Sequence, residues 1–474
     1  MSLSTRSDAI KDFRPIGLSN FFFKIITKFL DTRLGTVLNR LISEEQVAFM
    51  KGRNIHENIA LASELINEIS TPRNFGNVGL KLDIAQAFDT ISWEFITEVF
   101  RQYEGFFGIT RGLHQGDPLS RLIFVLIEDI LSRNLSKLFA NRSMHNMVSK
   151  KGVAPTHFLF ADDILVFCRG NLHSLQNLKT MLSVYEKASG QCVNYAKSKF
   201  YYSGGTYSRS IAITNYLGME RALFLDKHLG IQLKPGILRH IHVRQVVENI
   251  MDKLAGWKGK LLSFQARLVL IRSLIASYVI HYMAVYKWPC NIIKRVKRAI
   301  MNFLWSGDAE KSKFFTVLYD NLCCSRRECG MGLRRLIDVN KAMLMKLWIS
   351  IRDSDKTWDR FLRVKYFKLN GVLIDYKLGY TVFPGISTRD LMVRLNIDVG
   401  NLPIIVGGDD YKIWDFDSKG VFSFKSAKAA IRENAETLPT ATLFSRPVVH
   451  PTLSVQYWKI WAKQCCASDD NVIK

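Results

Sequence analysis

Two adjacent aspartates, Asp162 and Asp163, interrupt an otherwise apolar stretch, FLFADDILVF at 158–167. Side chains of a regular strand alternate between its two faces, so neighbouring aspartates cannot point the same way there. Both can lie in a hairpin turn between two short apolar strands. A solvated turn is the simpler interpretation, because aspartate is common in turns. The usual two-residue hairpin turns are Asn-Gly or Asp-Gly, however, which leaves a chemical role open.

A third carboxylate makes that chemical role specific. Asp83 ends another apolar stretch, VGLKLD at 78–83. Two strands that carry aspartates and flank a helical segment can lie side by side, so that their acids converge. Clustered carboxylates repel one another unless cations neutralise them, and Mg²⁺ or Mn²⁺ are the hard cations that oxygen ligands suit. Two such ions about 3.5–4 Å apart can hold the attacking and leaving oxygens of a phosphoryl displacement. We therefore predict Asp83, Asp162 and Asp163 as the catalytic and metal-binding residues of a nucleotidyl-transfer site.

The bulk composition agrees with a nucleic-acid partner. The chain has 474 residues, of which 48% are hydrophobic, so it can bury a large core and is not a disordered protein. Its formal net charge of +24 attracts polyanions, most often nucleic acid and less often an anionic membrane. A merely soluble basic protein is the alternative on charge alone.

The cysteines and the N-terminus indicate an intracellular protein. The 8 cysteines are scattered without the spacing of a disulfide framework. The first residues show no apolar core of a signal peptide. We therefore expect reduced thiols and a nuclear or cytoplasmic protein that is not secreted. Cys323, Cys324 and Cys329 could suggest a metal, but no CxxC pair or nearby histidine pair accompanies them, so no zinc is expected.

The longest apolar stretch, about 261–286, is the one candidate for a membrane segment. Gln265, Arg267 and Arg272 interrupt it. Charged residues are costly in a bilayer, so a buried basic helix fits better than a membrane span.

The first half of the chain alternates between strand and helix patterns, which indicates an α+β or α/β class. Asn54 is a possible N-cap, Pro118 suits a first helical turn, and Gly190 could end a helix. From about residue 237 the pattern turns helical and basic, and beyond about 311 a smaller module follows. Apolar periodicity predicts helices over 20–42, 54–69, 117–139 and 172–188, a strand over 78–88 that leads into a helix through Trp93 and Phe100, and a strand pair over 157–167.

Five ordered motifs make a family resemblance specific. They are DFRPIGLSNFFFKIITKFLDTRL (12–34), QVAFMKGRNIHENIALASELI (46–66), LKLDIAQAFDTISW (80–93), RGLHQGDPLS (111–120) and FLFADDILVF. In this order they resemble the successive motifs of reverse transcriptases from plant LINE-type (non-LTR) retrotransposons. Stretches at 257–282, 330–348 and 414–427 resemble the downstream part of the same family, so the resemblance covers nearly the whole chain.

The resemblance implies an α+β right-hand polymerase with fingers, palm and thumb, followed by a mostly helical basic region and a small C-terminal module. Asp83, Asp162 and Asp163 fall on the family's metal-binding aspartates. The implied partners are an RNA template, a DNA primer and dNTPs, with Mg²⁺ or Mn²⁺ as cofactor; the oligomeric state stays open. The implied domains are fingers over 1–75, palm over 76–235, a thumb-like region over 236–310, and a C-terminal connection over 311–474 that is the upstream part of a zinc-binding-type region without its cysteines.

Nucleotide-binding residues follow from the same resemblance. Phe88 matches the aromatic position that screens the sugar, and Gln115 with Gly116 matches the pair that packs against the nascent base pair. Arg14 matches a finger residue that contacts the triphosphate, and Lys197 could protonate the pyrophosphate leaving group. The alternatives are a core aromatic, an ordinary turn before a helix, a surface arginine and a solvated lysine.

The thumb-like segment carries the expected contacts to the template–primer backbone. Its basic residues lie among Trp257 and Phe264, and a solvated basic face is the alternative. The residues expected to bind nucleic acid are Lys253, Lys258, Lys260, Arg267 and Arg272.

The sequence also departs from the family's pattern at several positions. Only 32 positions separate Asp83 from Gln115, which is shorter than the family pattern and indicates a palm deletion or a mis-spliced gene model. His114, Arg121 and His228 replace the family's usual basic residue, proline and tyrosine. Neither an endonuclease nor a ribonuclease H domain is recognisable, so we expect an internal fragment of a polyprotein. The first hypothesis is an RNA-directed DNA polymerase; the alternative is a catalytically inactive remnant that still binds nucleic acid.

Overall fold

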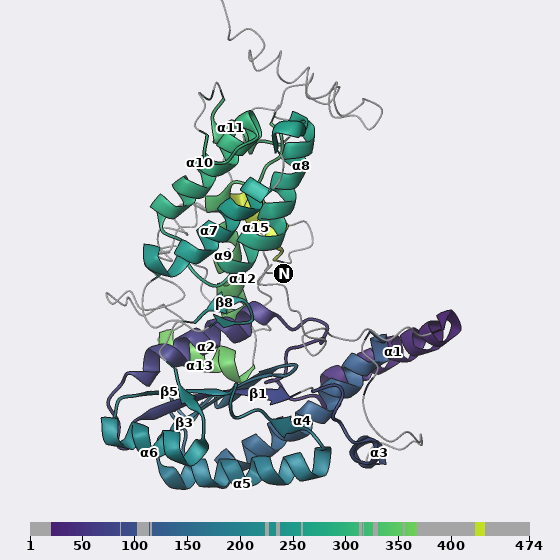
Figure 1. Ribbon diagram of the computed structural model, residues 1–474, viewed down its shortest axis with the longest axis vertical. Helices are drawn as coiled ribbons and strands as arrows, with labels where there is room; N and C mark the ends of the chain where they lie inside the picture. Colours follow the sequence, from purple (N-terminus) through teal and green to yellow (C-terminus); the bar gives the residue numbers. More distant parts are fainter. Residues whose placement is uncertain are drawn as a thin grey trace, which may run out of the picture. The chain divides into compact units, whose positions relative to one another are not determined.

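The chain divides into two compact units. The computed structural model describes residues 20–85, 87–101, 113, 116–222, 227–233, 238–256, 259–311, 315, 317–325, 330–353, 356–366 and 422–431. The described residues up to 233, together with 356–366, belong to the first unit, and the others belong to the second. Helices and strands are mixed in the first unit, whereas the described part of the second is helical (Figure 1).

The helices of the first unit confirm the sequence periodicity. Asn54 accepts a hydrogen bond from the His56 N–H and caps the second helix, as predicted. Gly190 ends another helix in the left-handed conformation, with φ of 78°. The helices are α1 (Phe21–Leu41), α2 (Ile55–Ile69), α3 (Trp93–Arg101), α4 (Pro118–Ala140), α5 (Leu172–Ser189), α6 (Tyr207–Leu217) and α13 (Thr357–Tyr366).

The sheet of the first unit is built around one central strand. Strand β1 pairs antiparallel with β3 on one side and β5 on the other, and the order is β2-β3-β1-β5-β6. β4 pairs with the end of β1, and β7 and β8 form a separate hairpin. The strands are β1 (Asn77–Ala85), β2 (His157–Phe160), β3 (Asp163–Arg169), β4 (Cys192–Val193), β5 (Lys199–Ser203), β6 (Glu220–Arg221), β7 (Lys227–His228) and β8 (Ile231–Gln232).

The two faces of β1 have different roles. Its even-numbered residues, from Val78 to Ile84, are buried apolar side chains in one core cluster with residues of α4, α5 and α6. α5 and α6 lie along this face of the sheet (Figure 1). The odd-numbered residues Gly79, Lys81 and Asp83 face the other side, where the Ile69 side chain of α2 approaches Gly79. Burial of each of these aliphatic side chains stabilises the fold by about 1.5–3 kcal/mol. This pattern therefore holds Asp83 on the face of β1 opposite the core cluster.

A helix from far along the chain completes the first unit. α13 contacts α2 through the Lys365 ammonium, which lies 3.0 Å from a Glu64 carboxylate oxygen and 2.8 Å from one of Glu68. Lys356 makes a further pair with Glu57 at 3.3 Å. Burial lowers the pKa of Lys365, and the two carboxylates more than offset it, so its pKa is raised. The region 311–474 was expected to be one C-terminal connection, but this part of it belongs to the first unit.

The second unit is a helical bundle over its described residues. α8 has its buried side at Leu268, Ile271 and Leu274. α12 packs against α15 through Met345 and Ala427. The helices are α7 (His240–Gly256), a 3₁₀ turn (Gly259–Leu261), α8 (Phe264–Leu274), a π-helical turn (Ile275–Val279), α9 (Ile280–Met283), α10 (Cys290–Ser306), α11 (Tyr319–Leu322), α12 (Leu336–Asp353) and α15 (Phe424–Ile431).

The stretch Phe264–Met283 is long and apolar enough to cross a membrane by length and composition alone. A core helix of a soluble protein meets the same criteria, so this observation is weak evidence for a membrane span. Mixed helix and sheet agrees with the α+β expectation, whereas fingers, palm and thumb remain predictions.

The α2–α13 ion pairs give a stability prediction. In Lys365→Met, the Glu64 carboxylate, only 1% exposed, loses its ammonium partner. We expect the free energy of unfolding of the first unit to fall by about 3 kcal/mol or more. Urea-dependent hydrogen exchange of the β1 amides measures this change. Lys187→Met removes an exposed lysine of α5 in the same unit and, as the control, costs less than about 1 kcal/mol. Equal effects would contradict the role given to the buried pairs.

Candidate active site

The predicted carboxylates meet at one end of the sheet. Asp83 at the end of β1 is the register partner of Asp163 at the start of β3. Directly opposite residues of an antiparallel pair share a face, with Cβ atoms about 4.5–5.5 Å apart. Asp162 is next to this pair, in the loop between β2 and β3. The convergence expected from the sequence is therefore present.

The turn differs from the expectation in one respect. Both aspartates were expected in the turn, but only Asp162 lies there, because Asp163 pairs with Phe160 as the first residue of β3. Ala161 is the first loop residue, with a φ of 52°. Two-residue hairpin turns need positive φ at this position, where glycine is the usual residue. Because Ala161 occupies this position, Asp162 is the second loop residue and Asp163 is the first residue of β3.

The charges of Asp83 and Asp162 affect the pKa of Asp163. Burial raises the pKa of Asp163, the Lys81 ammonium lowers it, and the charges of Asp162 and Asp83 raise it further, so that it is raised overall. Unneutralised like charges at this spacing fit a site for a hard cation.

A metal would need ligands from outside the chain. Within the described residues, no group of three His, Cys, Asp or Glu side chains could hold a metal ion. Polymerase-type Mg²⁺ is usually bound by one or two carboxylates and by substrate phosphates rather than by an all-protein cage. The Asp83–Asp163 pair with Asp162 therefore fits a cation that binds together with substrate.

The loop 194–198 fixes the end of β1. The Asp83 N–H donates to Ser198 Oγ at 3.0 Å, and the Asn194 N–H donates to the Asp83 carbonyl at 2.7 Å. Lys197 is exposed in this turn, and its N–H donates to the Asn194 carbonyl. The structure therefore brings Lys197 into the loop next to Asp83. Sequence reasoning missed Asn194 and Ser198; the one available signal is Asn194, because asparagine is common in turns.

Phe88 follows β1 in a turn rather than in a helix. Its ring stacks on Phe124 of α4, with the centroids 4.2 Å apart and an angle of 14° between the ring planes. The Leu113 N–H donates to its carbonyl at 2.7 Å. One face of the ring is therefore packed on the core, which agrees with the core-aromatic alternative. Its role in screening the sugar stays a prediction.

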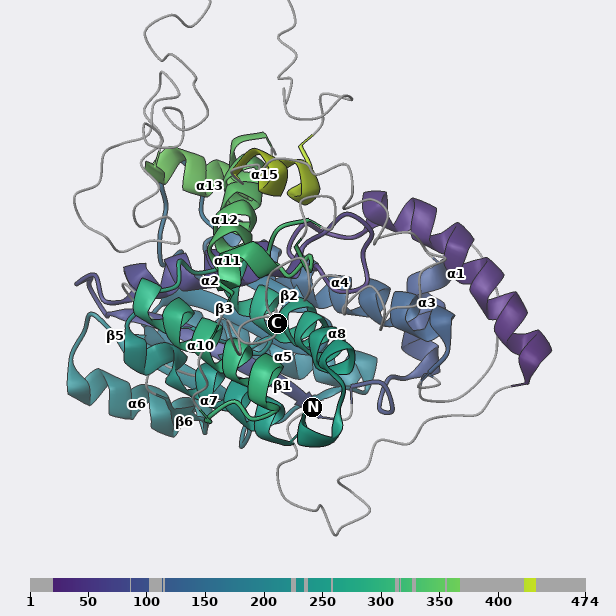
Figure 2. The same ribbon diagram turned by 90° about the horizontal axis from the view of Figure 1, so that it is seen from above.

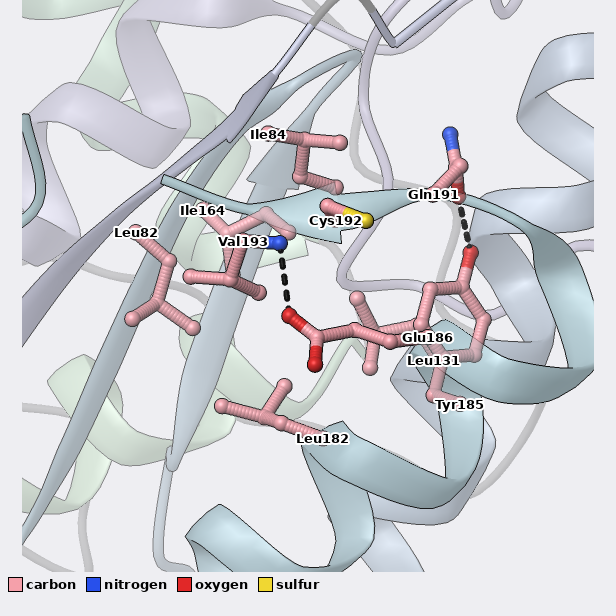
Figure 3. Close-up of a pocket in the computed structure, with 10 residues that line it drawn as sticks. All are labelled: Leu82, Ile84, Leu131, Ile164, Leu182, Tyr185, Glu186, Gln191, Cys192 and Val193. Carbon is pink, nitrogen blue, oxygen red and sulfur yellow. Dashed lines mark hydrogen bonds between the residues drawn. The ribbon is translucent and has the colours of Figure 1, made fainter. Parts of the chain in front are cut away.

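A buried polar network lies behind this turn. Gln191 donates from Nε2 to the Ala87 carbonyl at 3.1 Å and to the Glu128 carboxylate at 3.0 Å. It accepts from the Tyr185 hydroxyl at 2.5 Å, the bond that Figure 3 shows. Burial raises the pKa of Glu128, the Gln191 hydrogen bond lowers it, and the Asp162 charge raises it, to about 8. Glu128 is therefore largely protonated at neutral pH. No local sequence pattern indicates this network, because its members lie on separate elements.

The remaining nucleotide-binding predictions are placed in part. Gly116 has a φ of 102°, which favours glycine, and it precedes Asp117, whose carboxylate caps α4. Arg121, which replaces the family's proline, pairs with the buried Asp31 of α1 at 3.2 Å. α1 extends beyond the sheet in both views (Figures 1 and 2). Arg14 and Gln115 lie outside the described residues.

The basic residues of the second unit differ in what they contact. Lys253 and Lys260 are exposed. Arg267 donates to the carbonyls of Gly259 and Leu304, and Arg272 donates to that of Met331, so both guanidinium groups hold backbone. Lys258 lies outside the described residues. α10 adds an exposed basic face that was not predicted as a site, although its amphipathic spacing was visible: Lys294, Arg295 and Arg298.

His157 supports the hairpin from the core side. Its Nε2 lies 2.9 Å from the Ser132 hydroxyl of α4, and its Nδ1 lies 2.9 Å from the Thr156 hydroxyl. Burial lowers the pKa of His157 to about 4, although the interaction with Ser132 raises it. Burial and the Lys81 charge likewise lower the pKa of His228 to about 3.

Comparison with known proteins shows a family similarity in the part of the chain that carries the aspartates. Residues 5–221 match the family described as reverse transcriptase (RNA-dependent DNA polymerase). This part of the chain is therefore similar to reverse transcriptases.

The relatives come from plants and animals. A protein of Arabidopsis thaliana, named for ribonuclease H, is 30% identical over 123 residues, which are 26% of this chain and 20% of that protein. An uncharacterized 149 kDa protein of transposon TX1 from Xenopus laevis is 24% identical over 336 residues, or 63% of this chain and 24% of that protein. The retrovirus-related Pol polyprotein of the type-2 retrotransposable element R2DM from Drosophila melanogaster is 26% identical over 186 residues, or 33% and 16%.

The chain spans about a quarter or less of the length of these relatives. Among solved structures, telomerase from Candida albicans in complex with a TWJ fragment of telomeric RNA matches 73% of this chain and 59% of that chain. Its identity is 9% and its TM-score 0.31, which is too low to define the fold.

The buried His157 gives a pH prediction. The unfolded chain takes up a proton near pH 6.5, whereas the folded protein takes it up only near pH 4. This contribution to stability is therefore complete above pH 6.5 and is lost as the pH falls to 4, by about 3 kcal/mol. In His157→Gln, we expect a shallower loss of unfolding free energy over this range, with the His228 contribution retained. Urea unfolding between pH 7 and pH 4 measures the slope. The exposed His173, changed to Gln, is the control and keeps the wild-type slope; a full slope in His157→Gln would contradict the prediction.

Proposed function

We propose that this chain is an RNA-directed DNA polymerase domain of a LINE-type (non-LTR) retrotransposon. The observation that carries the proposal is the Asp83–Asp163 register pair with Asp162 in the adjoining turn, within the residues that match reverse transcriptases. The names of the relatives from transposon TX1 and element R2DM support the assignment to a mobile element.

The chemistry is transfer of a nucleotide to a primer 3′-hydroxyl. Mg²⁺ or Mn²⁺ held by these aspartates together with substrate phosphates would supply charge neutralisation at the transferring phosphoryl group. The chain's own contribution is positioning. Ser198 and Asn194 fix the backbone of Asp83, so its carboxylate is held opposite Asp163. Lys197, in the same loop, would hold or donate a proton at the leaving pyrophosphate.

Selection of the sugar rests on Phe88. Because its ring is stacked on Phe124, the side chain has little freedom to move away from an incoming sugar. A ring fixed in this way collides with a 2′-hydroxyl and admits a deoxyribose, since the 2′-hydroxyl is what distinguishes the two sugars. The resemblance to the family supports this role.

Template and primer would bind through charge. Lys253 and Lys260 are exposed, as is the basic face of α10, and such residues attract phosphates without reading sequence. Arg267 and Arg272 contribute by supporting the backbone of these helices.

A second function, a remnant that binds nucleic acid without catalysis, is favoured by a specific observation. The segment between Asp83 and Gln115 has only 32 positions, and it should contain palm elements next to the carboxylates. Loss of those elements would leave the basic surfaces intact and remove the chemistry.

Primer extension on an RNA template with Mg²⁺ and dNTPs separates the two functions. We expect extension by the wild type, a loss of about 100-fold or more in Asp162→Asn, and no extension with EDTA. Asp252→Asn, the same substitution at an exposed site, is the matched control and keeps full activity. Tight binding of template–primer without extension in the wild type would establish the remnant instead.

Charge reversal tests the basic surface. In the double variant Lys253→Glu/Lys260→Glu, we expect weaker template–primer binding and a salt dependence reduced by about one per lost phosphate contact. Fluorescence anisotropy over a salt series measures both. Lys137→Glu/Lys187→Glu changes the net charge equally, but its exposed lysines lie on α4 and α5, which cover the sheet face away from the carboxylates. Equal weakening in both variants would mean that only overall charge matters.

A further inference from the structure

The segment 45–47 contacts the free edge of the hairpin that carries the aspartates. β2 is the outer strand of the sheet. Its Leu159 N–H donates to the Glu45 carbonyl at 2.9 Å, and the Val47 N–H donates to the Leu159 carbonyl at 3.1 Å. These bonds form a parallel bridge of Gln46 with Leu159 and place the Gln46 side chain at the end of β2.

The Gln46 side chain reaches the turn itself. It is 0% exposed, and its Oε1 accepts from the Ala161 N–H at 3.2 Å and from the Ala48 N–H at 3.0 Å. Ala161 has a positive φ, which is unfavourable for a residue with a Cβ atom. A conformation of this kind persists only where surrounding contacts hold it. The bond from Gln46 is such a contact, one residue before Asp162.

The backbone of Gln46 and of the residues before it is itself held by hydrogen bonds. Arg53 donates from its guanidinium group to the carbonyls of Gln46, at 2.5 Å, of Ile42, at 2.9 Å, and of Ser43. The Ser43 N–H donates to the Asp129 carboxylate of α4 at 2.7 Å. The segment is therefore tied to a core helix, so a displacement of Gln46 is resisted from two sides.

We propose that Gln46 is a positioning residue that sets where the turn presents Asp162 and Asp163, and thereby the affinity of the site for a divalent cation. The inference rests on the proposed function, since it assumes that these aspartates bind the cation. Gln46 itself contacts neither cation nor substrate; it acts through the Ala161 N–H.

Asn58 provides a matched control. This buried α2 residue donates from Nδ2 to the Leu159 carbonyl at 3.3 Å, so it supports the same strand. That carbonyl also accepts from Val47, and the contact lies two residues before the turn. Removing Asn58 should weaken the strand edge without releasing Ala161.

The experiment compares Gln46→Met with Asn58→Leu, two substitutions that keep side-chain volume. Gln46→Met removes the acceptor of the Ala161 and Ala48 N–H groups, and Asn58→Leu removes the donor to the Leu159 carbonyl. Mn²⁺ binding is measured by electron paramagnetic resonance with dNTP and a template–primer whose primer lacks its 3′-hydroxyl, after subtraction of the Mn²⁺ that these bind without protein. Hydrogen exchange of the Ala161 amide is measured by NMR. We expect Gln46→Met to bind Mn²⁺ about tenfold more weakly and to exchange Ala161 about tenfold faster, because a buried N–H loses its acceptor. Asn58→Leu should match the wild type in both measurements, and the two variants should unfold at similar temperatures.

The outcomes separate this inference from the proposed function. Unchanged Mn²⁺ affinity in Gln46→Met, or equal weakening in both variants, would overturn the positioning role. If the wild type binds no Mn²⁺ and behaves as Asp162→Asn does, the proposed metal site fails. The exchange rate of Ala161 then still decides: faster exchange in Gln46→Met alone supports the hold on the turn, and an unchanged rate overturns it.

Discussion

Antiparallel pairing of β1 with β3 determines where the carboxylates lie. The register runs from Asn77 opposite Arg169 to Asp83 opposite Asp163. A slip by one residue would exchange the faces, so that Asp83 would enter the core and Leu82 would leave it. The burial of the even-numbered β1 residues against α4, α5 and α6 prevents this slip. The position of the site is therefore set by apolar packing on the opposite face of the same strand.

Hydrogen bonds to the backbone add to the strand register in positioning the aspartates. Ser198 and Asn194 hold the backbone of Asp83 from one side, and Gln46 holds the Ala161 N–H from the other. Each is a hydrogen bond to backbone, so the carboxylates themselves stay available. The Lys81 ammonium lowers the pKa of Asp163. It also donates to the Lys227 carbonyl at 2.7 Å and so links the β7–β8 hairpin to β1.

The sequence predicted the elements well, because local signals determine them. Periodicity and caps located α2 and α5 almost to the residue, and the apolar runs located β1 and the hairpin. It could not predict that Asp163 would leave the turn, since that depends on an unfavourable φ at Ala161. Nor could it predict the contact of Gln46 with the turn, because the Ala161 N–H that donates to Gln46 lies 115 positions away in the chain. Arg267 appeared to be a phosphate ligand from its charge alone, and its structural hydrogen bonds became visible only in three dimensions.

The return of α13 to the first unit affects how the chain is made. The pairing partners of Glu57, Glu64 and Glu68 are synthesised more than a hundred residues after the end of the sheet. At ordinary translation rates this interval is on the order of ten seconds, during which the α2 glutamates lack Lys356 and Lys365. A ribosome that stops within the second unit releases a sheet that already carries all three aspartates but lacks its last helix. The first unit is therefore complete only after translation has passed residue 366.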